Sequence, residues 1–382
     1  MDAQRPRLAT AVMFFVSGAV IGVWAANVPF VRDRLDASTT TLGLCLLAMA
    51  AGSVLTMPLA GRELQRRESR AMTRVGGLLV PLTAMLPLLA GSVPALALAL
   101  FVFGASVGLI DVSMNAHGVA VERVSGRAVM SSLHAGWSFG GLAGAGATAL
   151  GHALGADPRA TAALFMVVLL ALGLWAGPQM GEMSAADESP RTEAGAPARG
   201  RARPSRAVVV IGALVFALFM SEGALTDWSA LYLDRDLGSG ASLAAIGYGA
   251  FAGGMAVGRA FGDALKRAFG GVRLLRGGAL LTCVSIAAML LIGVPGVALV
   301  ALLLAGLGAA NGVPLLFSAA GHARDMDAGP AIATVSSAGY FGLLAGPPLL
   351  GFVADATSLP AALGIVALLT AVVALNAGRA DG

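Results

Sequence analysis

Long apolar stretches alternate with short polar connections along the whole chain. A helix needs about 20 apolar residues to cross the hydrocarbon core of a bilayer. Stretches of this length predict twelve transmembrane helices, at 8–30, 40–60, 73–91, 94–118, 130–151, 160–178, 207–232, 241–262, 274–293, 296–320, 330–352 and 358–376. The stretches lack the alternation of period two that marks a membrane β-barrel. The pattern therefore predicts an all-α membrane protein.

Charge is scarce and unevenly placed. Only 12% of the 382 residues are charged and 57% are hydrophobic, whereas about 25% of a soluble protein is charged. With a cytoplasmic N-terminus, 21 of the 25 Lys and Arg residues fall inside and four fall outside: Arg32, Arg34, Arg159 and Arg235. The positive-inside rule then predicts that both termini are cytoplasmic. The basic residues behind the net charge of +4 therefore serve as orientation signals. We expect a lipid bilayer as partner and no nucleic acid.

The long connection between the sixth and seventh stretches divides the chain. Residues 179–206 are polar and rich in Pro, Ala and Arg. Such a segment buries too little apolar surface to order itself, so we expect a disordered cytoplasmic linker. The predicted domains are therefore an N-terminal six-helix bundle at 1–178 and a C-terminal six-helix bundle at 207–382.

The two predicted bundles resemble each other in sequence. At an offset of 202, the phrase Ser138–Gly144 matches Tyr340–Gly346 at five of seven positions, and Phe14 pairs with Phe216. A duplicated six-span unit with both ends inside predicts parallel repeats about an axis along the membrane normal. Such repeats place a substrate site between the bundles, near the midplane of the membrane.

The connections after the second and eighth stretches carry a recognisable pattern. The second copy runs Gly258-Arg259-Ala-Phe-Gly262-Asp263 and continues to Lys266 and Arg267, and the first copy begins at Gly61 and includes Arg66. This pattern of a Gly, then an Asp, then basic residues resembles the signature loop of the major facilitator superfamily. The resemblance covers essentially the whole chain, because twelve spans, a central linker and two related halves are also typical of that family.

The resemblance implies a secondary transporter that rocks between inward-open and outward-open states. It also implies a cytoplasmic gate, which we assign to Arg259, Asp263, Gly258, Gly262, Gly61 and Arg66. The first copy departs from the family pattern, with Gln65 at the expected Asp position and Glu68 at an expected Gly position. Two further phrases, Asp111–Asn115 and Glu222–Trp228, resemble a bacterial inner-membrane subgroup distantly similar to fucose permease.

Three carboxylates lie well within the predicted spans: Asp111, Glu222 and Asp227. A charge in hydrocarbon is costly unless it faces a cavity or a partner, so each is a candidate for function. Asp111 and Glu222 are the predicted proton-coupling or substrate residues, and the alternative for Glu222 is a structural partner such as a hidden Arg. Asn115 lies four residues after Asp111 and shares its helix face. Asp227 lies nearer the outer end, where a cap or an interfacial pair is the favoured interpretation.

Other polar and aromatic residues are pocket candidates of second rank. Asn311, Trp137 and His134 belong to this set, although Asn311 could instead satisfy a carbonyl freed by Pro314 and His134 could be interfacial. Trp24 and Trp228, near outer ends, favour membrane anchoring over substrate stacking. We expect the remaining histidines to be solvated at helix ends: His117, His152 and His322.

No chemistry beyond transport follows from the motifs. A nucleotide-binding Gly-Lys-Ser/Thr loop is absent, and the chain shows neither a catalytic triad pattern nor a metal-ligand cluster. We therefore expect no enzyme activity, no cofactor, and a monomer that moves a small polar solute with protons across the inner membrane. Two alternatives stay open, namely an antiporter that exports a drug or metabolite and a sensor without turnover.

Overall fold

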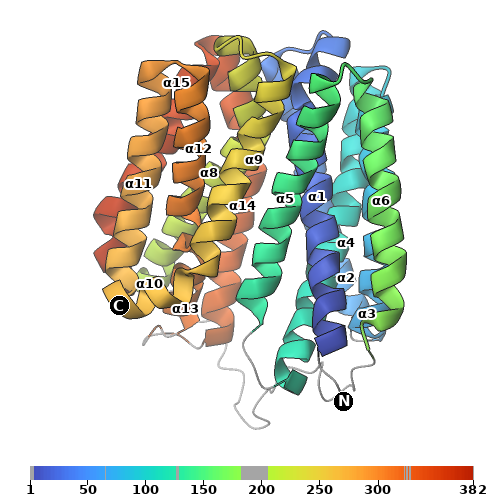
Figure 1. Cartoon of the computed structure of the whole chain (residues 1–382). Helices are drawn as coiled ribbons and strands as arrows, with labels where there is room; N and C mark the ends of the chain where they lie inside the picture. Colours follow the sequence, from blue (N-terminus) through green and yellow to red (C-terminus); the bar gives the residue numbers. More distant parts are fainter. Residues whose placement is uncertain are drawn as a thin grey trace.

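The protein is a bundle of long helices in a computed structural model, and all its regular structure within the described residues is helical. The structure describes residues 4–64, 66–125, 129–181, 205–321, 323, 326 and 328–381. Figure 1 shows the helices running roughly parallel, with the marked N and C ends of the chain at the same end of the bundle. We call this the terminal end and the opposite one the far end.

The first group of helices lies on one side of the bundle, from blue to green in Figure 1. Its members are α1 (Gln4–Arg34), α2 (Thr39–Glu63), α3 (Ser69–Leu89), α4 (Val93–Ser125), α5 (Met130–Ala153) and α6 (Pro158–Gln179). The second group lies on the other side. It consists of α8 (Arg206–Leu231), the π-helical turn η1 (Tyr232–Asp236), α9 (Ala241–Ala260), α10 (Gly262–Phe269), α11 (Gly271–Ile292), α12 (Pro295–Ala309), α13 (Gly312–Gly321), α14 (Ala328–Ala356), α15 (Leu359–Asn376) and the 3₁₀ turn η2 (Ala377–Asp381).

Eleven helices, counted within the described ranges, are long and apolar enough to cross a membrane. The predicted span that does not qualify is 130–151, which forms α5. Gly, Ser and His lower the hydropathy of this helix, which is nevertheless 24 residues long and runs beside α1 (Figure 1). The tenth predicted span is interrupted at residues 310–311, between α12 and α13.

Glycines allow close contact within each group, in equivalent places. A Cβ at Gly140 of α5 would lie 2.1 Å from the Phe15 carbonyl oxygen of α1, and a Cβ at Gly342 of α14 would lie 2.4 Å from that of Phe216 in α8. Small residues let helix backbones approach in membranes, where no hydrophobic force between helices acts. The repeat offset of 202 relates Gly140 to Gly342, so the same packing device recurs in both groups.

The two groups meet along two pairs of helices. α5 packs on α9, and α2 packs on α14, while α1 adds contacts with α8 and α9. One hydrophobic core continues across these contacts, because a single cluster of buried side chains includes Trp24 of α1, Trp228 of α8 and Tyr248 of α9. The residues along these four helices, and along the facing parts of α1 and α8, are therefore the ones placed between the groups.

Candidate functional site

An ion pair and a hydrogen bond join three helices at the contact between the groups. The Arg259 guanidinium of α9 lies 3.7 Å from the Glu222 carboxylate of α8, and both side chains are largely buried, with exposed fractions of 15% and 21%. Arg259 Nη1 also donates to Ser138 Oγ of α5 at 3.0 Å. One arginine thus connects an acid of its own group with a hydroxyl of the other group. We call these three residues the central triad.

Other polar and aromatic residues surround the central triad. His134 lies one turn before Ser138, whose hydroxyl donates to the His134 carbonyl at 3.3 Å. The His134 ring packs edge-on against Phe14 of α1, with centroids 5.1 Å apart. Tyr248 of α9 is buried within electrostatic range of the Glu222–Arg259 pair, and its hydroxyl has no hydrogen-bond partner among the described residues. The region therefore combines an acid, a base and unsatisfied polar atoms, which are groups that can bind a polar solute or a proton.

Asp111 and Asn115 form a second polar element on α4. Asn115 Nδ2 donates to the Asp111 carbonyl at 2.8 Å and to its carboxylate at 3.3 Å. Both side chains are half-buried, and the described residues provide Asp111 with no ion-pair partner. Tyr340 of α14 lies within electrostatic range of Asp111 and stacks on Phe219 of α8 at 6.1 Å. The expected shared face of Asp111 and Asn115 is confirmed by their hydrogen bonds.

The burial of two tryptophans contradicts the membrane-anchoring interpretation. Trp24 is 1% exposed and Trp228 is fully buried, so neither lies in an interfacial belt, and that prediction is wrong. Both indole Nε1 atoms lack partners among the described residues. Burial follows from their positions on α1 and α8, the helices that face the opposite group. Trp137 is half-buried on α5, where its backbone carbonyl packs against Gly18 of α1.

Residues assigned to the cytoplasmic gate are found in three settings. Gly258 near the end of α9 and Gly262 at the start of α10 both lie beside Asn311, whose amide donates to the Gly258 carbonyl at 3.0 Å. Asn311 thus joins the end of α9 to the break between α12 and α13. Arg259, between the two glycines, extends instead to the central triad. Gly61 has open space where a Cβ would be, and Arg66 is exposed.

Some expected residues lie outside the described part of the chain. These are the Asp263 side chain, Gln65, His322 and 182–204 of the predicted linker. His117 is described and corrects the expectation of a solvated histidine. It is fully buried between the Ser69 hydroxyl and the Met180 carbonyl, each 3.0 Å from a ring nitrogen. This position ties α4 to the start of α3 and the end of α6.

Ser138 and Tyr248 were not singled out from the sequence. Ser138 begins the repeated phrase 138–144 and lies four residues after His134, so its face could have been inferred. Tyr248 is one of three tyrosines in the chain and is a rare polar group within an apolar stretch. Among the described residues, no group of three or more His, Cys, Asp or Glu could hold a metal ion.

Comparison with known proteins gives agreement in sequence and in fold. The family model of the Major Facilitator Superfamily matches residues 9–325. An uncharacterised MFS-type transporter of Yersinia pestis is 38% identical over 373 residues, which cover 97% of this chain and 94% of that protein.

Two solved structures share the fold at low sequence identity. A mutant of the nucleoside transporter NupG superposes with a TM-score of 0.76 at 10% identity, over 99% of this chain and 100% of that one. A mutant of the Escherichia coli fucose:proton symporter FucP gives 0.66 at 18% identity, over the full length of both chains. At these identities the similarity concerns the arrangement of the helices.

Proposed function

The chain belongs to the major facilitator superfamily, and from this membership we propose that it is a proton-coupled secondary transporter of a small polar solute. The solute would move by alternating access between the two groups of helices. The protein has no enzymatic role in this proposal, and it needs no cofactor. The named activities of its structural neighbours, a fucose:proton symporter and a nucleoside transporter, agree with a hydroxyl-rich solute class.

The central triad is the observation that carries the proposal. The Glu222–Arg259 pair lies within the second group, and its arginine also bonds to a hydroxyl of the first group. Such an arrangement can respond to a proton and to the relative position of the groups at once. Glu222 is the proposed proton carrier, because its only ion pair among the described residues is with Arg259. Protonation of Glu222 would remove that pair and free Arg259 to favour Ser138 or a solute. Burial of an unpaired charge is costly in a membrane, so proton and solute movements become linked.

Asp111, on α4 of the first group, is the second proposed carrier. It has an amide partner in Asn115 and the aromatic pair Phe219–Tyr340 nearby, a setting that suits either a proton or a polar solute. Trp137 and His134 are proposed to line the solute path. Asn311 remains a proposed solute or coupling residue, and its bond to Gly258 also makes it a candidate to transmit movement of the gate.

The membrane arrangement belongs to the proposal as well. With α5 taken as the fifth span, twelve helices form two six-helix bundles, at 1–178 and 207–382, joined by a cytoplasmic linker at 179–206. The terminal end of the bundle is then cytoplasmic and the far end faces outward, in a bacterial inner membrane. The gate at the terminal end would use Gly258, Gly262, Asp263, Gly61 and Arg66.

A transport assay with one variant tests this function. A thermal-shift screen of sugars, polyols, nucleosides and amines on purified protein first identifies a solute that binds. In proteoliposomes, an imposed pH gradient should then drive accumulation of that solute by the parent protein. Glu222→Gln should lose accumulation and keep solute exchange, because the amide fills the site but carries no proton.

Asp157→Asn is the matched control, since Asn remains a good N-cap on α6 and the site is exposed. Accumulation by Glu222→Gln at the parent level would refute the role of Glu222.

Two alternatives give different results in the same assay. An exporter of a drug or metabolite would accumulate solute when the gradient is reversed, and its binding screen would favour amphipathic compounds. A sensor would be stabilised by the solute and would catalyse no flux in either direction. The central triad favours the transporter, because a largely buried ion pair that is hydrogen-bonded to the other group is not needed for stability, which apolar contacts would provide as well or better.

A further inference from the structure

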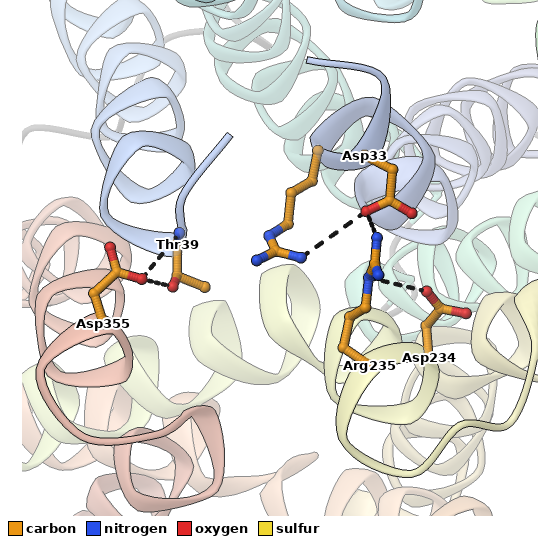
Figure 2. A network of polar contacts seen from close by, with 6 residues as sticks. Asp33, Thr39, Asp234, Arg235 and Asp355 are labelled. Atoms are coloured by element: carbon orange, nitrogen blue, oxygen red, sulfur yellow. Dashed lines mark hydrogen bonds and ion pairs between the residues drawn. The ribbon is translucent and has the colours of Figure 1, made fainter. Parts of the chain in front are cut away.

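A second set of polar contacts closes the far end of the bundle. Arg235 of η1 forms an ion pair with Asp33 at the end of α1 and lies 3.6 Å from Asp234. Figure 2 shows Asp355 on a separate ribbon, beside Thr39. Its carboxylate accepts from the backbone N–H groups of Thr39 at 3.1 Å and of Thr40 at 2.7 Å, and from the Thr39 hydroxyl. The Asp33–Arg235 pair and the contacts of Asp355 with Thr39 and Thr40 join the first group of helices to the second, whereas Asp234 lies in the same turn as Arg235.

Asp355 acts on α2 as an N-cap supplied from another helix. The first N–H groups of a helix have no partner within it, and a negative charge is favourable there. Ser38, the N-cap residue of α2, accepts only from the Thr41 N–H. Asp355 at the end of α14 satisfies the two preceding N–H groups. This contact therefore exists only while the ends of α2 and α14 stay together.

The repeat offset shows which far-end contacts are symmetric. Position 33 is related to position 235 by 202, so the ion pair joins equivalent places in the two groups, as occurs beside a two-fold axis. The Thr40 hydroxyl donates to the Gly351 carbonyl at 3.4 Å, and its equivalent Ser242 donates to the Ala149 carbonyl at 3.0 Å. Both hydroxyl contacts thus obey the same symmetry.

Asp355 breaks that symmetry. Its equivalent position is Ala153, so the α5–α9 side keeps the neutral hydroxyl contact and has no carboxylate. Packing alone explains the symmetric hydroxyl contacts but does not require the extra charge at α14. The carboxylate adds a directional bond that is lost when the α2–α14 side opens.

The contacts are placed where water can reach them. A cavity of about 210 Å³ is lined by Thr39 beside Asp355 and by Arg235 of the ion pair. Arg32 also lines it, 3.9 Å from Asp33, and its Nε atom has no partner among the described residues. When the far end opens, the charged groups that separate become hydrated, which lowers the cost of breaking their contacts. The contacts therefore bias the equilibrium between the closed and open far end without trapping the closed state.

We propose that Asp355 and the Asp33–Arg235 pair form a charged latch that holds the far end closed, and that the α2–α14 side is where this latch acts most strongly. The inference rests on the proposed alternating access. Beyond that proposal, it identifies the residues at the far end that set the balance between the inward-open and outward-open states. The neutral contact of Ser242 is assigned no such role.

Distances between spin labels test the latch without any solute. Ala95 at the start of α4, which packs on α2, and Ala356 at the end of α14 are exposed, and labels there report on the α2–α14 side. Labels at exposed Ala156, just after α5, and at exposed Ala241, the first residue of α9, report on the α5–α9 side. The native cysteines are first replaced by alanine. Pulsed electron resonance on purified protein then gives the populations of short and long distances.

Each variant has a defined expected result. Asp355→Asn should raise the ratio of long to short Ala95–Ala356 distances about tenfold, since a charged hydrogen-bond acceptor is lost. Asp33→Arg should raise the same ratio by repulsion from Arg235, and adding Arg235→Asp should restore the parent ratio. Ser242→Ala is the matched control and should leave both label pairs unchanged. Monodisperse elution and an unchanged melting temperature confirm that each variant is folded.

The outcomes separate this inference from the proposed function. Parent-like distances in Asp355→Asn would overturn the latch, as would an equal shift in Ser242→Ala or a failure of the charge swap to restore closure. Shifted distances in a protein that moves no solute would support the latch and refute the transporter. Solute transport combined with unshifted distances would refute the latch alone.

Discussion

At the scale of single residues, Arg259 has the most consequential position in the molecule. It belongs to a sequence pattern associated with the terminal end, yet its guanidinium lies against Glu222 and Ser138. The long side chain explains this difference, because it can reach an acid on a neighbouring helix while its backbone stays between two packed glycines. Glu222 and Arg259 offset each other's charge, which lowers the cost of keeping both away from bulk water.

Substitutions at Arg259 and Ser138 should separate charge from geometry. Arg259→Lys keeps the charge but loses the planar fork that serves two partners, so solute exchange should fall about tenfold or more. Ser138→Ala keeps the charge but removes the hydroxyl that accepts from the Arg259 guanidinium, and it should reduce exchange about tenfold, about 1.5 kcal/mol in free energy. The measurement is the initial exchange rate in proteoliposomes, with Ser132→Ala of the same helix as control. Equal rates for Arg259→Lys and the parent would show that the fork has no role.

At the scale of helices, close glycine contacts determine how each group packs. Helix α5 illustrates the point, since its Gly140 faces α1 while Gly146 faces open space. The low hydropathy of α5 has the same origin, because glycines and hydroxyl residues that suit a tight interface are less apolar than leucine. A hydropathy criterion therefore misses the helix that packs on both α1 and α9.

The two glycines of α5 predict opposite effects of one substitution. Gly140→Ala places a Cβ 2.1 Å from the Phe15 carbonyl oxygen, so α1 and α5 must separate, at a cost of about 1–3 kcal/mol. Gly146→Ala meets no atom within 4 Å and should be neutral or stabilising by up to about 1 kcal/mol, since Ala favours a helix. Thermal unfolding in detergent compares the two variants. A lower melting temperature for Gly146→Ala than for Gly140→Ala would contradict this packing account.

At the scale of the whole molecule, sequence periodicity and charge predict the helices better than the site. Apolar length places nearly every helix, because the bilayer requires a fixed span whatever the side chains are. Contacts between distant helices depend on rotation and side-chain reach, which hydropathy does not encode. The Arg259–Ser138 bond was missed for that reason. The Asp33–Arg235 pair could have been predicted from the sequence, because the repeat offset relates these two opposite charges to each other near the expected symmetry axis.

The orientation of the bundle is the last prediction, and it follows from charge alone. Ala156 lies at the far end, in the connection between α5 and α6, and Ala264 lies on α10, and both are exposed. If Lys and Arg gather on the cytoplasmic side, a membrane-impermeant maleimide should label Ala156→Cys in intact cells. It should label Ala264→Cys only after the membrane is permeabilised. The reverse pattern would place the termini outside and reverse the sides assigned to the gate and the latch, while labelling of both sites in intact cells would contradict any fixed orientation.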